Sequence, residues 1–304
     1  MVKQLREISG AGMMECKKAL AKCAGDFDKA AEELRKKGLA QAAKKATRVA
    51  SEGVIAVTER GHKITMIEVN CETDFVTKND NFISLVKQIS EATTQDDCQS
   101  LDNLKQQNIA ASNTSVEDAL VASTANIGEK IELRRFNCLE VKNGQTAYYV
   151  HNAVPGEANI GKIGVIVALE TDSKAAEVKQ FGEEVAMHIA DSNPQAISIA
   201  DLDPAAAEKE YNFLREQVAG TKKPENVIEK MVEGRMRKFY EEIVLLEQTS
   251  IMDDKKKVKD LLSDLNKKVG EEVKIVGFTR YALGEGVEKK EENFAEEVQK
   301  MTTA

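Results

Sequence analysis

The chain has few of the features that mark nucleic-acid-binding, fibrous or membrane proteins. Only four of its 304 residues are proline and eighteen are glycine, while 42% are hydrophobic, which excludes a collagen-like or wholly disordered chain. Lysine and arginine number 43 against 51 aspartates and glutamates, and this net charge of −8 argues against a general nucleic-acid binder. No apolar run approaches the roughly 20 residues of a membrane span.

Paired cysteines and targeting signals are also missing. The five cysteines are spread along the chain without a CxxC motif, so we expect reduced thiols that serve as small apolar residues. The first seven residues carry no apolar segment and include Glu7, unlike a secretory signal or a transit peptide. Together these features predict a cytoplasmic protein.

Catalytic and cofactor motifs are incomplete. The three histidines (His62, His151 and His188) have no metal-ligand spacing, and no GxGxxG occurs. Residues 156–162 match the first seven places of a phosphate-binding loop, but Ile163 stands where Ser or Thr would hold magnesium, and the loop runs into a strand. The sequence therefore favours a binding protein without cofactor or metal over an enzyme, with nucleotide hydrolysis at this loop as the alternative.

Residues 1–50 differ from the rest of the chain in charge, with twelve basic and six acidic residues for a net +6. Their apolar spacing predicts three short helices, the last ending at Gly38 before an Ala/Lys-rich tether. In the second helix Met14 falls opposite the stripe of Cys16 and Cys23, with Met13 at its edge. The two methionines either fill the core or present a soft apolar surface to a partner.

The remainder alternates between strands and helices, which predicts an α+β fold. We expect a hairpin of strands 54–58 and 64–70, helices over 82–89 and 116–127, and a second hairpin of 131–141 and 146–150 turning at Asn143-Gly144. A strand over 163–169, a helix over about 173–190, an antiparallel helical hairpin within 204–243, a strand over 273–283 and a last helix through Phe294 follow. Glu-Thr-Asp occurs after the strands at 72–74 and 170–172, which suggests two similar subdomains.

One short turn carries an unusual aromatic residue. Thr73-Asp74-Phe75-Val76 places a phenylalanine between a strand and a helix. Either Phe75 packs down on Phe82 or Leu85 as a hydrophobic staple, or it projects towards a partner.

Several motifs, in this order along nearly the whole chain, closely resemble those of the bacterial translation elongation factor Ts family. They are Gly10-Ala-Gly-Met-Met14 with Cys16–Leu20, Glu68–Val76, Ile127-Gly-Glu129, Met187–Ala190, Glu229–Arg235, Gly277–Arg280 and Gly284–Gly286. The resemblance implies a guanine nucleotide exchange factor that binds the GTPase elongation factor Tu, disrupts its magnesium and phosphate site and so promotes GDP release.

The resemblance also implies a domain plan. We expect a ubiquitin-associated-like three-helix domain with linker over 1–50, followed by core subdomains over 51–140 and 141–285. The second subdomain would contain the helical hairpin of 204–243, and a C-terminal helical module would span 286–304. Antiparallel sheets would form both subdomains.

Site residues follow from the motif matches. Thr73, Asp74, Phe75 and Val76 match the segment that enters near the partner's magnesium, and Met13 with Met14 would dock on its GTPase domain. Ile127 matches a further contact to that domain. His151 matches a contact to the partner's third domain, and Ile251 an apolar contact of the C-terminal part. The complex would be 1:1 or 2:2, with the helical hairpin as a candidate homodimer surface, and no nucleic acid or membrane would be bound directly.

One further class stays open on the residues alone. The N-terminal helices could serve a scaffold or adaptor that binds a partner without driving exchange.

Overall fold

The first fifty residues form three helices, as their apolar spacing predicts. The helices α1 (Val2–Ser9), α2 (Met13–Lys22) and α3 (Phe27–Lys45) pack around a small core that includes Leu5, Cys16, Leu20 and Leu34. Gly10 adopts a left-handed conformation and caps α1, and the Asp26 side chain accepts a hydrogen bond from the Lys29 amide to cap α3.

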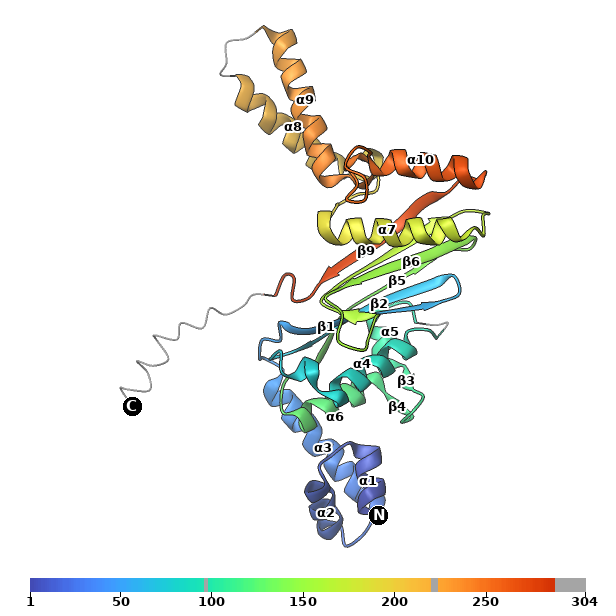
Figure 1. Ribbon diagram of the computed structural model, residues 1–304. Coiled ribbons are helices and arrows are strands. Elements are labelled where there is room, and N and C mark those ends of the chain that lie inside the picture. Colours follow the sequence, from blue (N-terminus) through green and yellow to red (C-terminus); the bar gives the residue numbers. More distant parts are fainter. Residues whose placement is uncertain (96–97, 220–223, 288–304) are drawn as a thin grey trace, which may run out of the picture. The chain divides into compact units, whose positions relative to one another are not determined.

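A computed structural model describes residues 1–95, 98–219 and 224–287 (Figure 1). The described residues divide into two compact units: residues 1–56, 67–137 and 282–287 belong to the first, and residues 57–66 with 138–281 to the second. The four changes from one unit to the other along the chain each fall within a strand. The predicted domain limits are not tested by this division and stay a prediction, and the expected helix through Phe294 lies outside the described residues.

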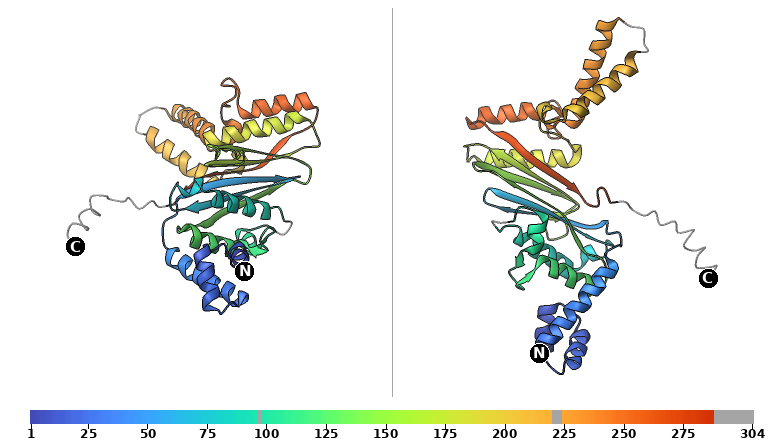
Figure 2. Two further views of the ribbon diagram at one scale, coloured as in Figure 1. Left: turned by 60° about the horizontal axis from the view of Figure 1, so that its bottom comes forward. Right: turned by 180° about the vertical axis from the view of Figure 1, so that it is seen from behind.

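Beyond α3, the first half of the chain forms a hairpin, several helices and a third long strand. These elements are β1 (Glu52–Arg60), β2 (Lys63–Cys71), the 3-10 turn η1 (Val76–Lys78), α4 (Asp80–Ala92), α5 (Leu101–Gln106), β3 (Asn108–Ile109), β4 (Thr114–Ser115), α6 (Val116–Ile127) and β5 (Glu132–Glu140). In the first unit α6 contacts α3, α4 and α5, and Figure 2 shows α4 to α6 gathered together in teal and green.

The second half contains a sheet covered by helices. Its elements are β6 (Gly144–His151), β7 (Ile160–Gly161), β8 (Ile163–Glu170), α7 (Ala176–Ser192), η2 (Ile199–Asp201), α8 (Pro204–Ala219), α9 (Glu225–Ile243), η3 (Leu245–Glu247), α10 (Val258–Val269) and β9 (Lys274–Ala282). Buried residues of α7 pack on β6 and β8, and α10 packs against α7 (Figure 1). The helices α8 and α9 share a separate small core that includes Leu214, Val218 and Val232. The helix α10 was not predicted, although Val258, Leu261 and Leu265 have helical spacing.

The sheets confirm the α+β class but correct one predicted hairpin. Strands are ordered β5-β2-β1-β7, β3-β4 and β6-β8-β9, so the strands on either side of Asn143-Gly144 lie in different sheets. The Val141 amide still donates to the His62 carbonyl, whereas the Asn143 carbonyl already accepts from Thr171. Gly144 has φ +149°, and a Cβ there would lie 1.9 Å from the Leu169 oxygen. This dipeptide therefore marks the change of sheet, where β6 approaches β8 closely.

A buried carboxylate joins three segments of the first unit. Glu68, on β2, is fully buried and accepts hydrogen bonds from Arg134 at 3.0 Å, from the Gly284 amide at 2.9 Å and from Asn70 at 3.1 Å, and it also pairs with Arg135. Arg134 and Arg135 also donate to the backbone carbonyls of residues 285 and 282. A buried charge is tolerated only with such partners.

Gly38 does not end its helix, contrary to the sequence prediction. It lies inside α3 and is buried, where a Cβ would lie 3.7 Å from Val121 and 3.9 Å from Ala125 of α6. The packing of α3 on α6 stabilises helical backbone that glycine alone disfavours, and the space at this position would also accept a methyl group.

We predict that Gly38→Ala raises the free energy of unfolding by about 0.5–1 kcal/mol, because alanine favours the helix and its methyl meets only ordinary van der Waals contacts. Urea unfolding measures the change. Gly182→Ala on α7 is the matched control and should destabilise, since its Cβ would lie 2.6 Å from Ala147. Loss of stability in Gly38→Ala would contradict the packing described for α3.

Candidate functional site

The segment from Thr73 to Val76 forms a short, well-bonded loop after β2. The Cys71 thiol donates to the Thr73 carbonyl at 3.1 Å, and the Thr77 hydroxyl donates to the Asp74 carbonyl at 2.7 Å. Val76 is buried and anchors the end of the loop in the core. The loop backbone is therefore fixed by local bonds rather than left to solvent.

Phe75 projects from this loop into solvent. Its exposed fraction is 76%, whereas Phe82 is fully buried, so the staple in which Phe75 packs on Phe82 or Leu85 is wrong. Asp74 beside it is also exposed. An aromatic ring held outward on a fixed loop costs hydration free energy that contact with another surface would recover.

Two carboxylates connect the loop to the turn after α6. Glu129 accepts from the Thr73 amide at 2.9 Å and from its hydroxyl at 2.7 Å. Glu72 accepts from the Lys130 amide at 2.6 Å and forms an ion pair with Arg48 at 3.2 Å. We call Glu72 and Glu129 the carboxylate clamp. Sequence reasoning missed their role, although both stand inside motifs that drew attention for other reasons.

Ile127 lies next to this clamp. It is the last residue of α6 and is half-buried, and Gly128 ends the helix in a left-handed conformation with φ +87°. Since Glu129 follows two residues later, the structure brings Ile127 and the Thr73–Val76 loop to one region of the first unit.

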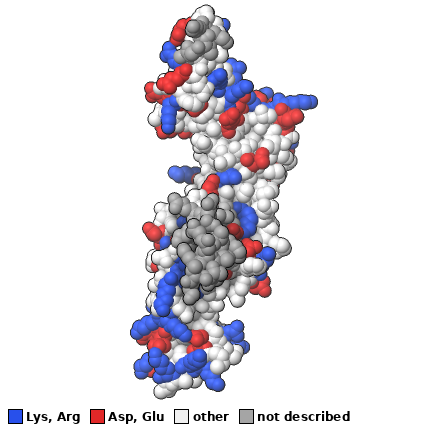
Figure 3. Space-filling model, turned by 90° about the vertical axis from the view of Figure 1, so that its left-hand side faces the viewer, with Lys and Arg blue, Asp and Glu red and all other residues white. Residues whose placement is uncertain are grey.

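Met13 and Met14 start α2 and are both exposed, at 57% and 63%. The core of the three helices is built from other side chains, so the core-filler alternative is wrong. Glu15 beside them is hydrogen-bonded to Lys37 of α3, which holds the pKa of the Glu15 carboxyl below its ordinary value. Figure 3 shows lysine and arginine side chains gathered over these helices, with acidic residues among them.

The remaining predicted residues lie in the second unit, on different elements. His151 ends β6, is exposed, and its Nδ1 lies 3.0 Å from the Tyr149 hydroxyl. Ile251 lies in the loop after η3 and is 43% exposed, and its neighbour Met252, which sequence reasoning did not single out, is 50% exposed. The signal for Met252 was its place beside Ile251 in a polar stretch.

Among the described residues no group of three or more His, Cys, Asp and Glu side chains could hold a metal ion, and all five cysteines are free thiols. Residues 156–162 lead through β7 directly into β8. None of the helices in the described ranges has the length and hydropathy that a membrane-spanning helix needs.

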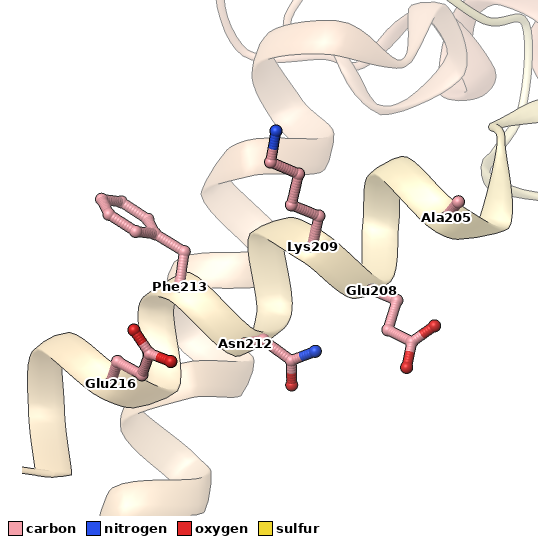
Figure 4. Close-up of a pocket in the computed structure, with 6 residues that line it drawn as sticks. All are labelled: Ala205, Glu208, Lys209, Asn212, Phe213 and Glu216. Carbon is pink, nitrogen blue, oxygen red and sulfur yellow. The ribbon is translucent and has the colours of Figure 1, made fainter.

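A surface hollow in the second unit also lacks catalytic character. Its lining residues all come from α8 (Figure 4): Ala205, Glu208, Lys209, Asn212, Phe213 and Glu216. Side chains spaced along one exposed helix do not converge on a common point, so this hollow is a groove between turns rather than an active site.

The exposed apolar side chains of Met13, Met14 and Phe75 are typical of a protein that binds another protein. Comparison with known proteins agrees: a model of the family described as "Elongation factor TS" matches residues 72–285. Elongation factor Ts of Rhodospirillum centenum is 45% identical over 304 residues, covering 99% of this chain and 97% of the relative. Those of Brucella anthropi and Sinorhizobium medicae are each 46% identical, covering 98% of this chain and 96% of the relative.

The chain belongs to the elongation factor Ts family. It is accordingly a nucleotide exchange factor for elongation factor Tu in translation elongation, and not an enzyme.

We predict that Glu129→Ala loosens the Thr73–Val76 loop, because it removes two hydrogen bonds to a charged acceptor, a loss of about 1.5–3 kcal/mol for each such bond. Amide hydrogen exchange of residues 73–77 should accelerate. Glu140→Ala, an exposed position at the end of β5, is the matched control and should leave the exchange unchanged. Equal protection in both variants would mean that the clamp does not hold the loop.

Proposed function

We propose that Phe75 is the side chain through which this chain opens the nucleotide site of elongation factor Tu. The observation that carries the proposal is a phenylalanine ring 76% exposed on a loop tied to the next turn by Glu129. Because the loop backbone is already held, insertion of the ring into a partner would cost little backbone conformational entropy. Asp74 accompanies it towards the magnesium and phosphate groups of the bound GDP.

Phe75 alone supplies too little free energy. Weakening GDP binding by 10⁴-fold requires about 5.5 kcal/mol of coupling, whereas burying one phenylalanine yields about 1.5–3 kcal/mol. A broad interface must therefore hold the partner while Phe75 directs part of the binding free energy to the metal site.

The coupling works in both directions. If the factor weakens the partner's hold on nucleotide, the nucleotide must weaken the factor's hold on the partner by the same ratio. GTP binding then releases the factor, which acts again without making or breaking a covalent bond.

The wider interface is assigned from the other predicted residues. We assign Met13 and Met14 to a helix of the partner's GTPase domain, because two exposed thioether side chains adapt well to an apolar partner surface. Ile127, beside the carboxylate clamp, contacts the same domain. His151 contacts the partner's third domain, and Ile251 contributes an apolar contact from the second unit.

We further propose the domain plan given by the family resemblance, with a ubiquitin-associated-like domain over 1–50, subdomains over 51–140 and 141–285 and a C-terminal module over 286–304. The α8–α9 pair is the surface for a 2:2 assembly, supported by the exposure of Phe213 at 53%. Sedimentation of the complex over a range of concentrations distinguishes 2:2 from 1:1. We place the protein in the cytoplasm, where translation elongation occurs.

We predict that Phe75→Ala folds normally but slows GDP release from elongation factor Tu by at least tenfold. The variant loses the free energy of burying the phenylalanine ring in the partner, which is up to about 3 kcal/mol. Stopped-flow release of a fluorescent GDP measures the rate. Leu39→Ala, which truncates a 47% exposed side chain on α3, is the control. An unchanged rate in Phe75→Ala would refute the role of the ring.

We predict that the double variant Met13→Ala, Met14→Ala weakens complex formation but leaves the rate of GDP release at saturating factor concentration nearly unchanged. In the proposed interface the methionines contribute to holding the partner, and Phe75 acts on its nucleotide site. Loss of the methionines should therefore weaken the affinity for elongation factor Tu and leave the rate of GDP release in the complex almost unchanged. Titration calorimetry with nucleotide-free elongation factor Tu measures the dissociation constant. Affinity equal to that of the Leu39→Ala control would remove the methionines from the interface.

A further inference from the structure

A buried histidine of the second unit contacts the loop that carries Ile251. His188 lies on α7 with an exposed fraction of 1%. Its Nε2 lies 2.9 Å from Gln248 Oε1, and its Nδ1 accepts a hydrogen bond of 3.4 Å from the Ile251 amide. The two ring nitrogens thus contact two different points of the chain after η3.

These contacts fix one tautomer of the ring. A backbone amide can only donate, so Nδ1 must be the unprotonated acceptor and Nε2 carries the proton that is donated to Gln248. Burial lowers the pKa of His188 below its ordinary value, which keeps the ring neutral. Gln248 is held in turn, since its side-chain amide donates to the Glu242 carbonyl at 2.7 Å.

The loop itself is closed at its base and exposed at its tip. Thr249 and Lys257 form an antiparallel bridge, and the Ser250 amide donates to the Lys256 carbonyl at 2.9 Å. Ser250 is buried, whereas the next two residues, Ile251 and Met252, are exposed. The bond from the Ile251 amide to His188 therefore lies where the loop passes from the core to the surface, and the next amide, that of Met252, donates to the Ser250 hydroxyl at 3.1 Å.

We propose that His188 is a positioning residue for partner binding: through Nδ1 it orients the Ile251 amide, and so presents Ile251 and Met252 to elongation factor Tu. This inference rests on the proposed contact role of Ile251. It differs from a purely structural role because each ring nitrogen has its own task. Nε2 joins α7 to Gln248 inside the core, and Nδ1 orients the binding loop.

Two substitutions separate the two nitrogens. In His188→Asn the amide oxygen can replace Nδ1 as acceptor, while the donor at Nε2 is lost. In His188→Gln the longer amide can replace Nε2 as donor to Gln248, while the acceptor for Ile251 is lost. Both variants introduce one amide into the same buried site, so each is the matched control for the other.

We expect His188→Gln to bind nucleotide-free elongation factor Tu about tenfold more weakly, the effect of losing most of one apolar contact. His188→Asn should retain affinity within about twofold, and the Ile251 amide should exchange fast in the Gln variant and slowly in the Asn variant. Titration calorimetry and amide hydrogen exchange measure both effects on the full chain. Equal losses of affinity in the two variants, or equal exchange at Ile251, would overturn the inference.

Two further measurements keep the tests independent. The double variant Ile251→Ala, Met252→Ala should weaken binding at least as much as His188→Gln, and unchanged affinity would refute the proposed contact role itself and this inference with it. If both His188 variants unfold, the ¹⁵N shifts of the ring in the unchanged protein decide: a proton on Nε2 is expected, and a proton on Nδ1 would overturn the inference.

Discussion

The first unit depends on one buried carboxylate. Glu68 accepts hydrogen bonds from two arginines of β5 and from the backbone amide of Gly284, so a single side chain joins a strand, its neighbour and a segment more than two hundred residues later. Removing a buried charge from water costs several kcal/mol, and a group of this kind persists only where its partners are held in place. Since β2 leads directly into the Phe75 loop, this arrangement fixes the strand from which the loop projects.

Two further carboxylates, Glu72 and Glu129, join the loop to the turn after α6. Glu129 accepts a hydrogen bond from the Thr73 amide of the loop, and Glu72 accepts one from the Lys130 amide of the turn. The apolar ring is thus exposed on a support whose polar groups are satisfied within the protein. An exposed apolar side chain on a hydrogen-bonded frame is the arrangement on which the proposed role of Phe75 rests.

Much of the architecture could be predicted because local chemistry decides it. Helical spacing located α2, α3, α4 and α7, and it also indicated the helical hairpin within 204–243. Asn143-Gly144 misled, because the same dipeptide that closes a tight hairpin also allows the close approach of β6 to β8, and only the distant partner strand decides between them. Gly38 misled for a similar reason: the neighbour that stabilises it belongs to α6, eighty residues away.

The sequence indicated which residues belong to the candidate site, but it did not indicate the hydrogen bonds that hold them in place. Phe75, Met13 and Met14 stood out in the sequence, but the residues alone left a core role open for each of them, and only their exposure in the structure excluded it. Glu129, His188 and Gln248 gave no such signal, since each acts through a hydrogen bond to a residue distant in sequence. Periodicity reports which faces are buried, but a sequence does not show which polar groups meet.

The unbroken course of α3 has a consequence for selectivity. Because the helix continues past Gly38 and packs on α6, the methionine pair and Phe75 belong to one compact unit. If both contact elongation factor Tu as proposed, binding at one raises the effective concentration of the other at its own contact surface. A GTPase on which these two contact surfaces are spaced differently would then gain only one of them, and selectivity would depend on distance as well as on chemistry.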